Sequence, residues 1–240
     1  MMEPLLSLEG IHAGYGRTEI LHGIDLQLAA GRSMCLVGPN GAGKSTVLHS
    51  IFGFARIRRG TIRVEGREVT GLSPSEKLAR SRIGYVLQDN SVFPDMTVEE
   101  NLWMGGYLLP RAAEARQAAE RVFDRYPQLA RRRRDPARVL SGGERRLLEI
   151  SRALMMDPLL LLVDEPSIGL EPRYVEMVFE ILSDLQCAEG KTILIVEQNA
   201  RKGLQFADHG CVLVAGKVAR TGTGAELLGD AEVGRLYLGG

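Results

Sequence analysis

Residues 38–45, GPNGAGKS, place glycines, a lysine and a serine in the spacing G-x-x-x-x-G-K-S. The segment follows the β-like run SMCLV and opens a helix-like run, which is the context in which this spacing binds phosphates. Glycines let backbone N–H groups turn toward one anion, and the helix N-terminus adds positive charge. We predict a nucleotide phosphate loop; the alternative is an ordinary glycine turn before a helix. The candidate binding residues are Gly38, Pro39, Asn40, Gly41, Ala42, Gly43, Lys44, Ser45 and Thr46.

Acidic residues follow an apolar run, LLLLVDE, at residues 159–165. Such a run is typical of a parallel strand buried on both faces, and ligands bind outside the carboxyl ends of these strands. Lys44 would reach the β- and γ-phosphates, while Ser45 and Asp164 would hold Mg²⁺. Glu165 would orient and deprotonate an attacking water. The alternative is a pair of acids that only ends a strand, but beside a phosphate loop they indicate a nucleotide hydrolase.

A further glycine pair occurs in LSGGERR, residues 140–146, where a helix-like run begins. Glycine costs a helix roughly 1 kcal/mol relative to alanine, so its presence here needs a reason. Taken alone, Ser141, Gly142 and Gly143 would only cap the helix. Their backbone N–H groups at a helix N-terminus could also bind an anion. The phosphate loop already binds one nucleotide. The second glycine segment could therefore bind the phosphates of another nucleotide.

The three motifs together resemble those of the nucleotide-binding subunit of an ABC transporter, over nearly the whole chain. In that family two subunits pack head to tail, and each signature covers the nucleotide held by the other subunit. The resemblance implies an α/β fold: a P-loop NTPase core with an N-terminal antiparallel β subdomain and an inserted α-helical subdomain. It implies one ABC ATPase domain over residues 1–240. The RecA-like core with the β subdomain would occupy about 1–90 and 157–240, and the helical subdomain with the signature about 91–156.

The resemblance assigns further residues to the site. Tyr15 matches the aromatic residue that stacks on adenine, although it could be an ordinary strand tyrosine. Gln88 matches the glutamine that joins the core to the helical insert and contacts Mg²⁺ and the attacking water; the alternative is a polar loop residue. SIGLEP, residues 167–172, matches the loop between paired subunits, with Glu171 where the family often has aspartate.

One position departs from the common family pattern. After the run TILIV, Gln198 stands where most members have a histidine that contacts the γ-phosphate. Glutamine can donate a hydrogen bond but cannot carry the positive charge of a histidine. VEQN, SIGLEP and a YLG ending resemble the second ATPase of importers for branched-chain amino acids, and of related urea and amide importers. The resemblance therefore implies that Gln198 joins Glu165, Gln88 and Lys44 as a catalytic residue.

That resemblance also implies partners: a non-identical ATPase subunit, two polytopic permease subunits and a periplasmic or extracellular solute-binding protein. ATP and Mg²⁺ would be the ligands, and the chain would lie at the cytoplasmic face of the cell membrane. The alternatives are an ATPase for export, with the same chemistry, and a soluble ABC ATPase that acts on nucleic acid or ribosomes. Thirty acidic and thirty basic residues cancel, which argues against nucleic acid as the main partner.

Other features of the sequence indicate structure more than chemistry. Arg131–Arg134 are interpreted as a solvated basic face of the helical insert, with nucleic acid or acidic lipid as the alternative. Trp103 and Met104 could pack in the core or contact a membrane subunit. The histidines His12, His22, His49 and His209 lack metal-site spacing. The cysteines Cys35, Cys187 and Cys211 lack a CxxC pair, which favours free thiols.

The pattern of hydrophobic residues predicts how the elements position these motifs. Short β-like runs fill the first ninety residues and are interrupted by one helix from about Lys44. Helical periodicity dominates from about 97 to 156, where Thr97 and Glu100 form a predicted capping box. After 157 strand and helix alternate: the run at 211–219 is expected to be one strand, and the run from Gly224 the last helix.

Overall fold

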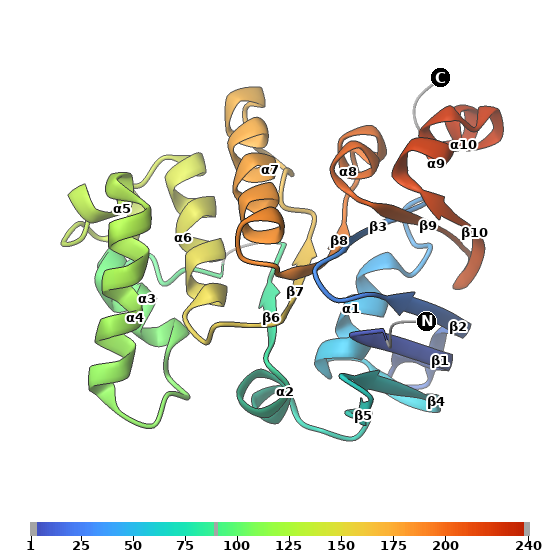
Figure 1. Cartoon of the computed structure of the whole chain (residues 1–240), viewed down its shortest axis with the longest axis horizontal. Helices are drawn as coiled ribbons and strands as arrows, with labels where there is room; N and C mark the ends of the chain where they lie inside the picture. The colour runs from blue at the N-terminus through green and yellow to red at the C-terminus, as the bar shows by residue number, and fades with distance from the viewer. Residues whose placement is uncertain (1–3, 89–90, 238–240) are drawn as a thin grey trace.

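The computed structural model describes residues 4–88 and 91–237. Within these ranges the strands form two sheets, with a group of helices at the opposite end of the molecule from the N-terminal sheet (Figure 1). The predicted α/β class is confirmed. None of the helices seen in these ranges is long and apolar enough to span a lipid bilayer.

The N-terminal sheet is antiparallel and has the strand order β2-β1-β4-β5. One face of these strands is apolar and buried, as the alternation of residue types along them requires. The pairing of β1 with β2 contains bulges, which bend the hairpin that ends near Tyr15. The strands are β1 (Leu6–Tyr15), β2 (Thr18–Leu28), β4 (Arg56–Val64) and β5 (Arg67–Glu68).

The second sheet has the order β10-β9-β3-β8-β7-β6, with β10 antiparallel to β9 and the other pairs parallel. Its central strands β3, β8 and β7 are buried along their whole length, as expected for parallel strands covered on both faces. The carboxyl ends of β3 and β7 therefore meet at one edge. The strands are β3 (Ser33–Val37), β6 (Ile83–Val86), β7 (Leu160–Asp164), β8 (Thr192–Val196), β9 (His209–Val214) and β10 (Lys217–Thr223).

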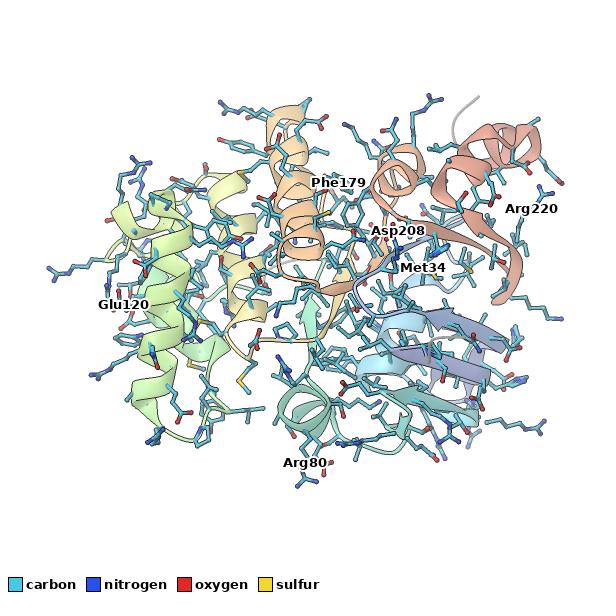
Figure 2. The ribbon with its side chains drawn as sticks, in the orientation of Figure 1. Met34, Arg80, Glu120, Phe179, Asp208 and Arg220 are labelled. Atoms are coloured by element: carbon cyan, nitrogen blue, oxygen red, sulfur yellow. The ribbon has the colours of Figure 1, made fainter. Side chains whose placement is uncertain are left out.

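Helix α1 (Lys44–Phe52) lies between the two sheets, where Val47, Leu48 and Ile51 are fully buried. On the other face, α7 (Pro172–Cys187) and α8 (Ala200–Phe206) pack together, with the rings of Phe179 and Phe206 5.8 Å apart. Asp208, which precedes β9, accepts hydrogen bonds from the backbone and hydroxyl of Ser33 and so joins β3 to β9 (Figure 2). The Asp208 contacts tie together the amino ends of β3 and β9, at the edge of the sheet opposite the phosphate loop.

The helices at residues 98–154 form the end of the molecule farthest from β1 and β2 (Figure 1). The predicted capping box at Thr97 and Glu100 is present, with the two reciprocal bonds at 3.2 Å and 2.8 Å. The elements are α3 (Val98–Gly105), α4 (Ala112–Arg125), α5 (Pro127–Arg131), a short 3₁₀ helix (Ala137–Val139) and α6 (Gly142–Leu154).

The arginine run in this helical region is tied to acidic residues. Arg133 forms ion pairs with Glu99 of α3 and Glu120 of α4. Arg132 pairs with Asp135 and Glu144. The run therefore joins several helices, which is more than the solvated face expected from its sequence.

Some expectations about the elements were wrong. The first ninety residues contain a second helix, α2 (Pro74–Ser81), whose signal was the capping box of Ser73 and Glu76. The run at 211–219 is the β9–β10 hairpin, because Ala215 and Gly216 adopt the positive φ values that a tight turn requires. The last helix is divided into α9 (Gly224–Gly229) and α10 (Ala231–Tyr237).

Candidate active site

The predicted phosphate loop connects β3 to α1. Gly43 precedes the helix at φ 99°, and a Cβ there would lie 2.8 Å from Leu21, so both the conformation and the space call for glycine. Lys44 is 6% exposed and donates to the carbonyl oxygens of Gly38 at 2.9 Å and Pro39 at 3.1 Å. The loop thus curls around the lysine ammonium, beside the N-terminus of α1.

Asp164, at the end of β7, faces this loop. Its Oδ1 accepts a hydrogen bond from Ser45 Oγ at 3.0 Å, and its Oδ2 accepts one from Tyr85 Oη at 3.1 Å. Burial raises the pKa of Asp164, and the bonds from Ser45 and Tyr85 oppose this effect. Tyr85 was not among the predicted site residues. The sequence signal for it was its position in the strand that leads to Gln88.

Glu165 has the strained backbone that often marks a functional residue. Its φ is 43°, in the left-handed region that non-glycine residues rarely adopt. Its N–H donates to Val196 at 2.8 Å, and its Oε2 accepts a hydrogen bond from Gln88 Nε2 at 3.1 Å. The two residues that the sequence placed in separate motifs are therefore in direct contact.

Part of the phosphate loop, Gln88 and Glu165 line one cavity of about 400 Å³, whereas Asp164 and Tyr85 are not among its lining residues. Gln198, an exposed residue after β8, reaches the same cavity from its other side. The structure therefore brings together the phosphate loop, both glutamines and Glu165. The lining residues are Asn40, Gly41, Gly43, Lys44, Ser45, Gln88, Glu165, Ile168 and Gln198.

Helix α6 supports Gln88 through Arg146, a residue that the sequence did not single out. The Arg146 guanidinium donates to the carbonyl oxygens of Leu87 at 3.1 Å and Gln88 at 2.9 Å. Arg146 also forms a buried ion pair with Glu149 at 2.8 Å. The helix that begins at the signature thus holds the backbone at Gln88. Asp89 and Asn90, which follow it, lie outside the described residues.

The signature segment lies away from this cavity. Ser141 is the N-cap of α6 and shares a capping box with Glu144, at 2.9 Å and 3.2 Å. A Cβ on Gly143 would lie 2.1 Å from the ring of Tyr174, so α7 packs directly on this helix start. Gly142 is exposed. None of the three is among the residues that line the cavity.

Tyr15 lies at the end of β1 and is 39% exposed. It is not among the cavity residues; its hydroxyl is hydrogen-bonded to Nδ1 of His49 on α1. Partial burial raises the Tyr15 pKa, and a hydrogen bond with Thr46 opposes the rise. The ring therefore stands beside the phosphate loop, with one side open to solvent.

The SIGLEP loop is joined to the segment that carries Gln198. Ser167 Oγ donates to Glu197 Oε1 at 2.8 Å, and Asn199 N donates to the same oxygen at 3.0 Å. Glu197 is buried, which raises its pKa. This carboxyl links the loop after Glu165 to the residues that flank Gln198.

Trp103 and Met104 have different surroundings. Trp103 packs partly against the core, with the Arg116 guanidinium 5.7 Å from its ring centroid, whereas Met104 is 38% exposed. Trp103 also lines a cavity of about 290 Å³ with the exposed Tyr107. Leu238 and Gly239, part of the predicted YLG ending, lie outside the described residues.

Comparison with known proteins places this geometry in a family. Residues 21–168 match the ABC transporter family. The chain is 41% identical, over 98% of its length and all of the relative, to the high-affinity branched-chain amino acid transport ATP-binding protein BraG of Pseudomonas aeruginosa. It is 36% identical to the probable branched-chain amino acid transport ATP-binding protein LivF of Archaeoglobus fulgidus, covering 95% of this chain and 96% of the relative. It is 35% identical to the lipopolysaccharide export system ATP-binding protein LptB of Acidithiobacillus ferridurans, covering 99% and 98%.

The fold agrees with this match. The crystal structure of the ADP conformation of MJ1267, an ATP-binding cassette of an ABC transporter, superimposes with a TM-score of 0.87 at 28% identity, covering 100% of both chains. The predicted P-loop core with its antiparallel and helical additions is therefore confirmed. The chain belongs to the ABC transporter family, as an ATP-binding subunit that hydrolyses ATP.

Proposed function

We propose that this chain powers the uptake of branched-chain amino acids, or of a related small solute, through separate membrane subunits. The identity of 41% with BraG, against 35% with LptB, supports an importer over an exporter. VEQN and SIGLEP support the same subfamily. The observation that carries the chemistry is the pair of contacts from Ser45 to Asp164 and from Gln88 to Glu165 at one edge of the sheet.

In this proposal the phosphate loop holds ATP in the cavity, and Lys44 turns from the Gly38 and Pro39 carbonyl oxygens toward the β- and γ-phosphates. Glu165 accepts the proton of the attacking water, whose oxygen forms a bond to the γ-phosphorus. The bond from that phosphorus to the bridging oxygen breaks, which leaves ADP and phosphate. Gln88, hydrogen-bonded to Glu165, keeps the carboxylate oriented.

We propose that Mg²⁺ binds beside the phosphates. The Ser45 hydroxyl and Asp164 carboxylate present oxygen atoms 3.0 Å apart, and Mg²⁺ prefers such hard ligands. Gln88 adds an amide oxygen from the neighbouring strand end. When bound, the ion neutralises charge on the phosphate oxygens. Tyr85 would then hold the second oxygen of Asp164 in place.

We propose that Ser141, Gly142 and Gly143 serve the nucleotide of a second ATPase subunit in a head-to-tail pair. Their position outside the chain's own cavity supports this arrangement. Tyr15 would stack on the adenine of the chain's own ATP. The helical region at about 91–156 would contact one of two polytopic permease subunits through the exposed Met104 and Tyr107. A solute-binding protein would deliver the solute, and the chain would work at the cytoplasmic face of the membrane.

We propose that the partner ATPase is non-identical and that the site with Gln198 hydrolyses ATP more slowly than its sister site. An amide can donate a hydrogen bond to the γ-phosphate but cannot bring the charge of an imidazolium. Replacing Gln198→His in the assembled transporter should therefore increase the turnover of ATP. Unchanged turnover would contradict the role given to Gln198.

The whole proposal is tested by purifying a tagged Glu165→Gln chain from native membranes with Mg-ATP. This variant should bind ATP without hydrolysing it and so hold the closed pair together. The matched control is Lys44→Ala, which should lose ATP and release the partner ATPase. We expect a second, different ATPase and two polytopic membrane proteins.

Two other sets of copurified molecules would point to a different function. Recovery of permeases for an exported lipid would favour the export function, which the 35% identity with LptB keeps as the second candidate. Recovery of ribosomes, nucleic acid or the tagged chain alone would overturn the importer proposal and leave the ATPase chemistry unaffected.

A further inference from the structure

The β1–β2 hairpin brings together residues that have no part in the nucleotide site. His12 on β1 lies directly opposite His22 on β2, and the carboxylate of Glu19, a residue nearer the turn, contacts both imidazoles. Histidines ten positions apart showed no metal-binding pattern in the sequence. Strand pairing brings the two residues opposite each other, although their sequence spacing gave no sign of a metal site.

The donor atoms converge on one point. Nδ1 of His12 lies 2.8 Å from Glu19 Oε1, and Nδ1 of His22 lies 3.2 Å from the same oxygen. All three ligand atoms lie within 4.8 Å of one another. Around Zn²⁺, bonds of about 2.0–2.2 Å in a tetrahedron place neighbouring ligand atoms roughly 3.3 Å apart. The observed spacing therefore needs only small side-chain rotations to accept an ion.

The three side chains are accessible to a dissolved ion. The side chains of the three residues are between 31% and 40% exposed, so an ion can reach them and water can complete its coordination. The Arg58 guanidinium lies 3.9 Å from Glu19 Oε2 and leaves Oε1 to the histidines.

We propose that His12, Glu19 and His22 form a binding site for a divalent transition-metal ion of the zinc class. Two imidazole nitrogens and one carboxylate oxygen are the donor set that such ions accept, whereas Mg²⁺ prefers oxygen ligands alone. The backbone fixes the site: His22 N donates to Gly216 O at 2.8 Å, and Gly216 N donates to Ala42 O at 3.0 Å. These bonds connect the backbone of His22 through Gly216 to Ala42 of the phosphate loop.

The test uses the full chain, stripped of metal and free of nucleotide, with 1 mM Mg²⁺ so that hard-ligand sites do not take up zinc. All proteins carry Cys187→Ser, because this thiol is exposed and could bind zinc by itself. Zn²⁺ is titrated against a chromophoric chelator. We expect one equivalent to bind, with the affinity reduced at least tenfold by His12→Gln and by His22→Gln.

His209→Gln is the matched control, since His209 is exposed on β9 and belongs to no metal cluster in residues 4–88 and 91–237. It should leave zinc affinity unchanged. Thermal unfolding of the metal-free variants checks that each is folded. Co²⁺ gives a second readout on the parent protein, where visible absorption bands of a nitrogen–oxygen site are expected. Zinc binding that is unaffected by both histidine variants, or the absence of both zinc binding and cobalt bands, would overturn the proposal.

Discussion

Lys77 of helix α2 gives a test of how the fold supports the helix that carries the phosphate loop. It is a lysine with 0% exposure, and its ammonium donates a long hydrogen bond of 3.4 Å to Ser50 O near the end of α1. Burial lowers the pKa of Lys77 from 10.5 to about 8. The folded chain therefore binds this proton less tightly than the unfolded chain does.

The lower pKa of Lys77 in the folded chain makes the free energy of unfolding depend on pH. Stability should rise as the pH increases from about 8 to 10.5, because the unfolded chain binds more protons in this window. At 1.36 kcal/mol per pKa unit, the charged lysine costs about 3 kcal/mol at pH 7 and about 1 kcal/mol at pH 10. Lys77→Met removes this cost but loses a hydrogen bond worth about 1 kcal/mol. We expect a net gain of about 2 kcal/mol at pH 7.

Thermal unfolding at pH 7 and pH 10 measures this change. A gain of about 2 kcal/mol should raise the melting temperature of the Lys77→Met chain by about 4–8 °C at pH 7, and the advantage should vanish by pH 10. Arg80→Met on the same helix is the matched control, because Arg80 is exposed. If the curves of Lys77→Met and the unmodified chain run parallel between pH 7 and pH 10, the reasoning from burial is refuted.

Two further predictions concern the site and its surroundings. Tyr85→Phe removes the hydrogen bond of 3.1 Å to Asp164. We therefore expect ATP turnover, measured by phosphate release, to fall tenfold or more and to require a higher Mg²⁺ concentration. An unchanged dependence of turnover on Mg²⁺ would contradict this role of Tyr85. Gly143→Ala should destabilise the chain by about 1–3 kcal/mol in urea unfolding, because its Cβ would overlap the ring of Tyr174. Gly142→Ala is the control, because a Cβ at this position would lie 3.6 Å from its nearest neighbour. It should reduce the free energy of unfolding much less.

Local chemistry made part of this protein readable from the sequence. A phosphate loop needs glycines, a lysine and a hydroxyl within eight residues, and a helix start needs a cap and an acid three residues later. These groups interact with near neighbours, so α1 and α3 were predictable. Helix α7 and the buried strand before Asp164 were predictable from the pattern of their apolar residues. Where the local signal was weak, as in the Ala215–Gly216 turn, the prediction failed.

Contacts between distant segments that no motif includes were not readable, because they depend on which strands become neighbours. Tyr85 and Asp164 are 79 positions apart and meet only because β6 pairs with β7. Arg146 reaches the backbone of Gln88 across 58 positions, through the packing of α6. His12 and His22 face each other only through the register of β1 and β2. Sequence motifs thus name the groups that bind phosphate, while strand order and helix packing select the partners that orient them.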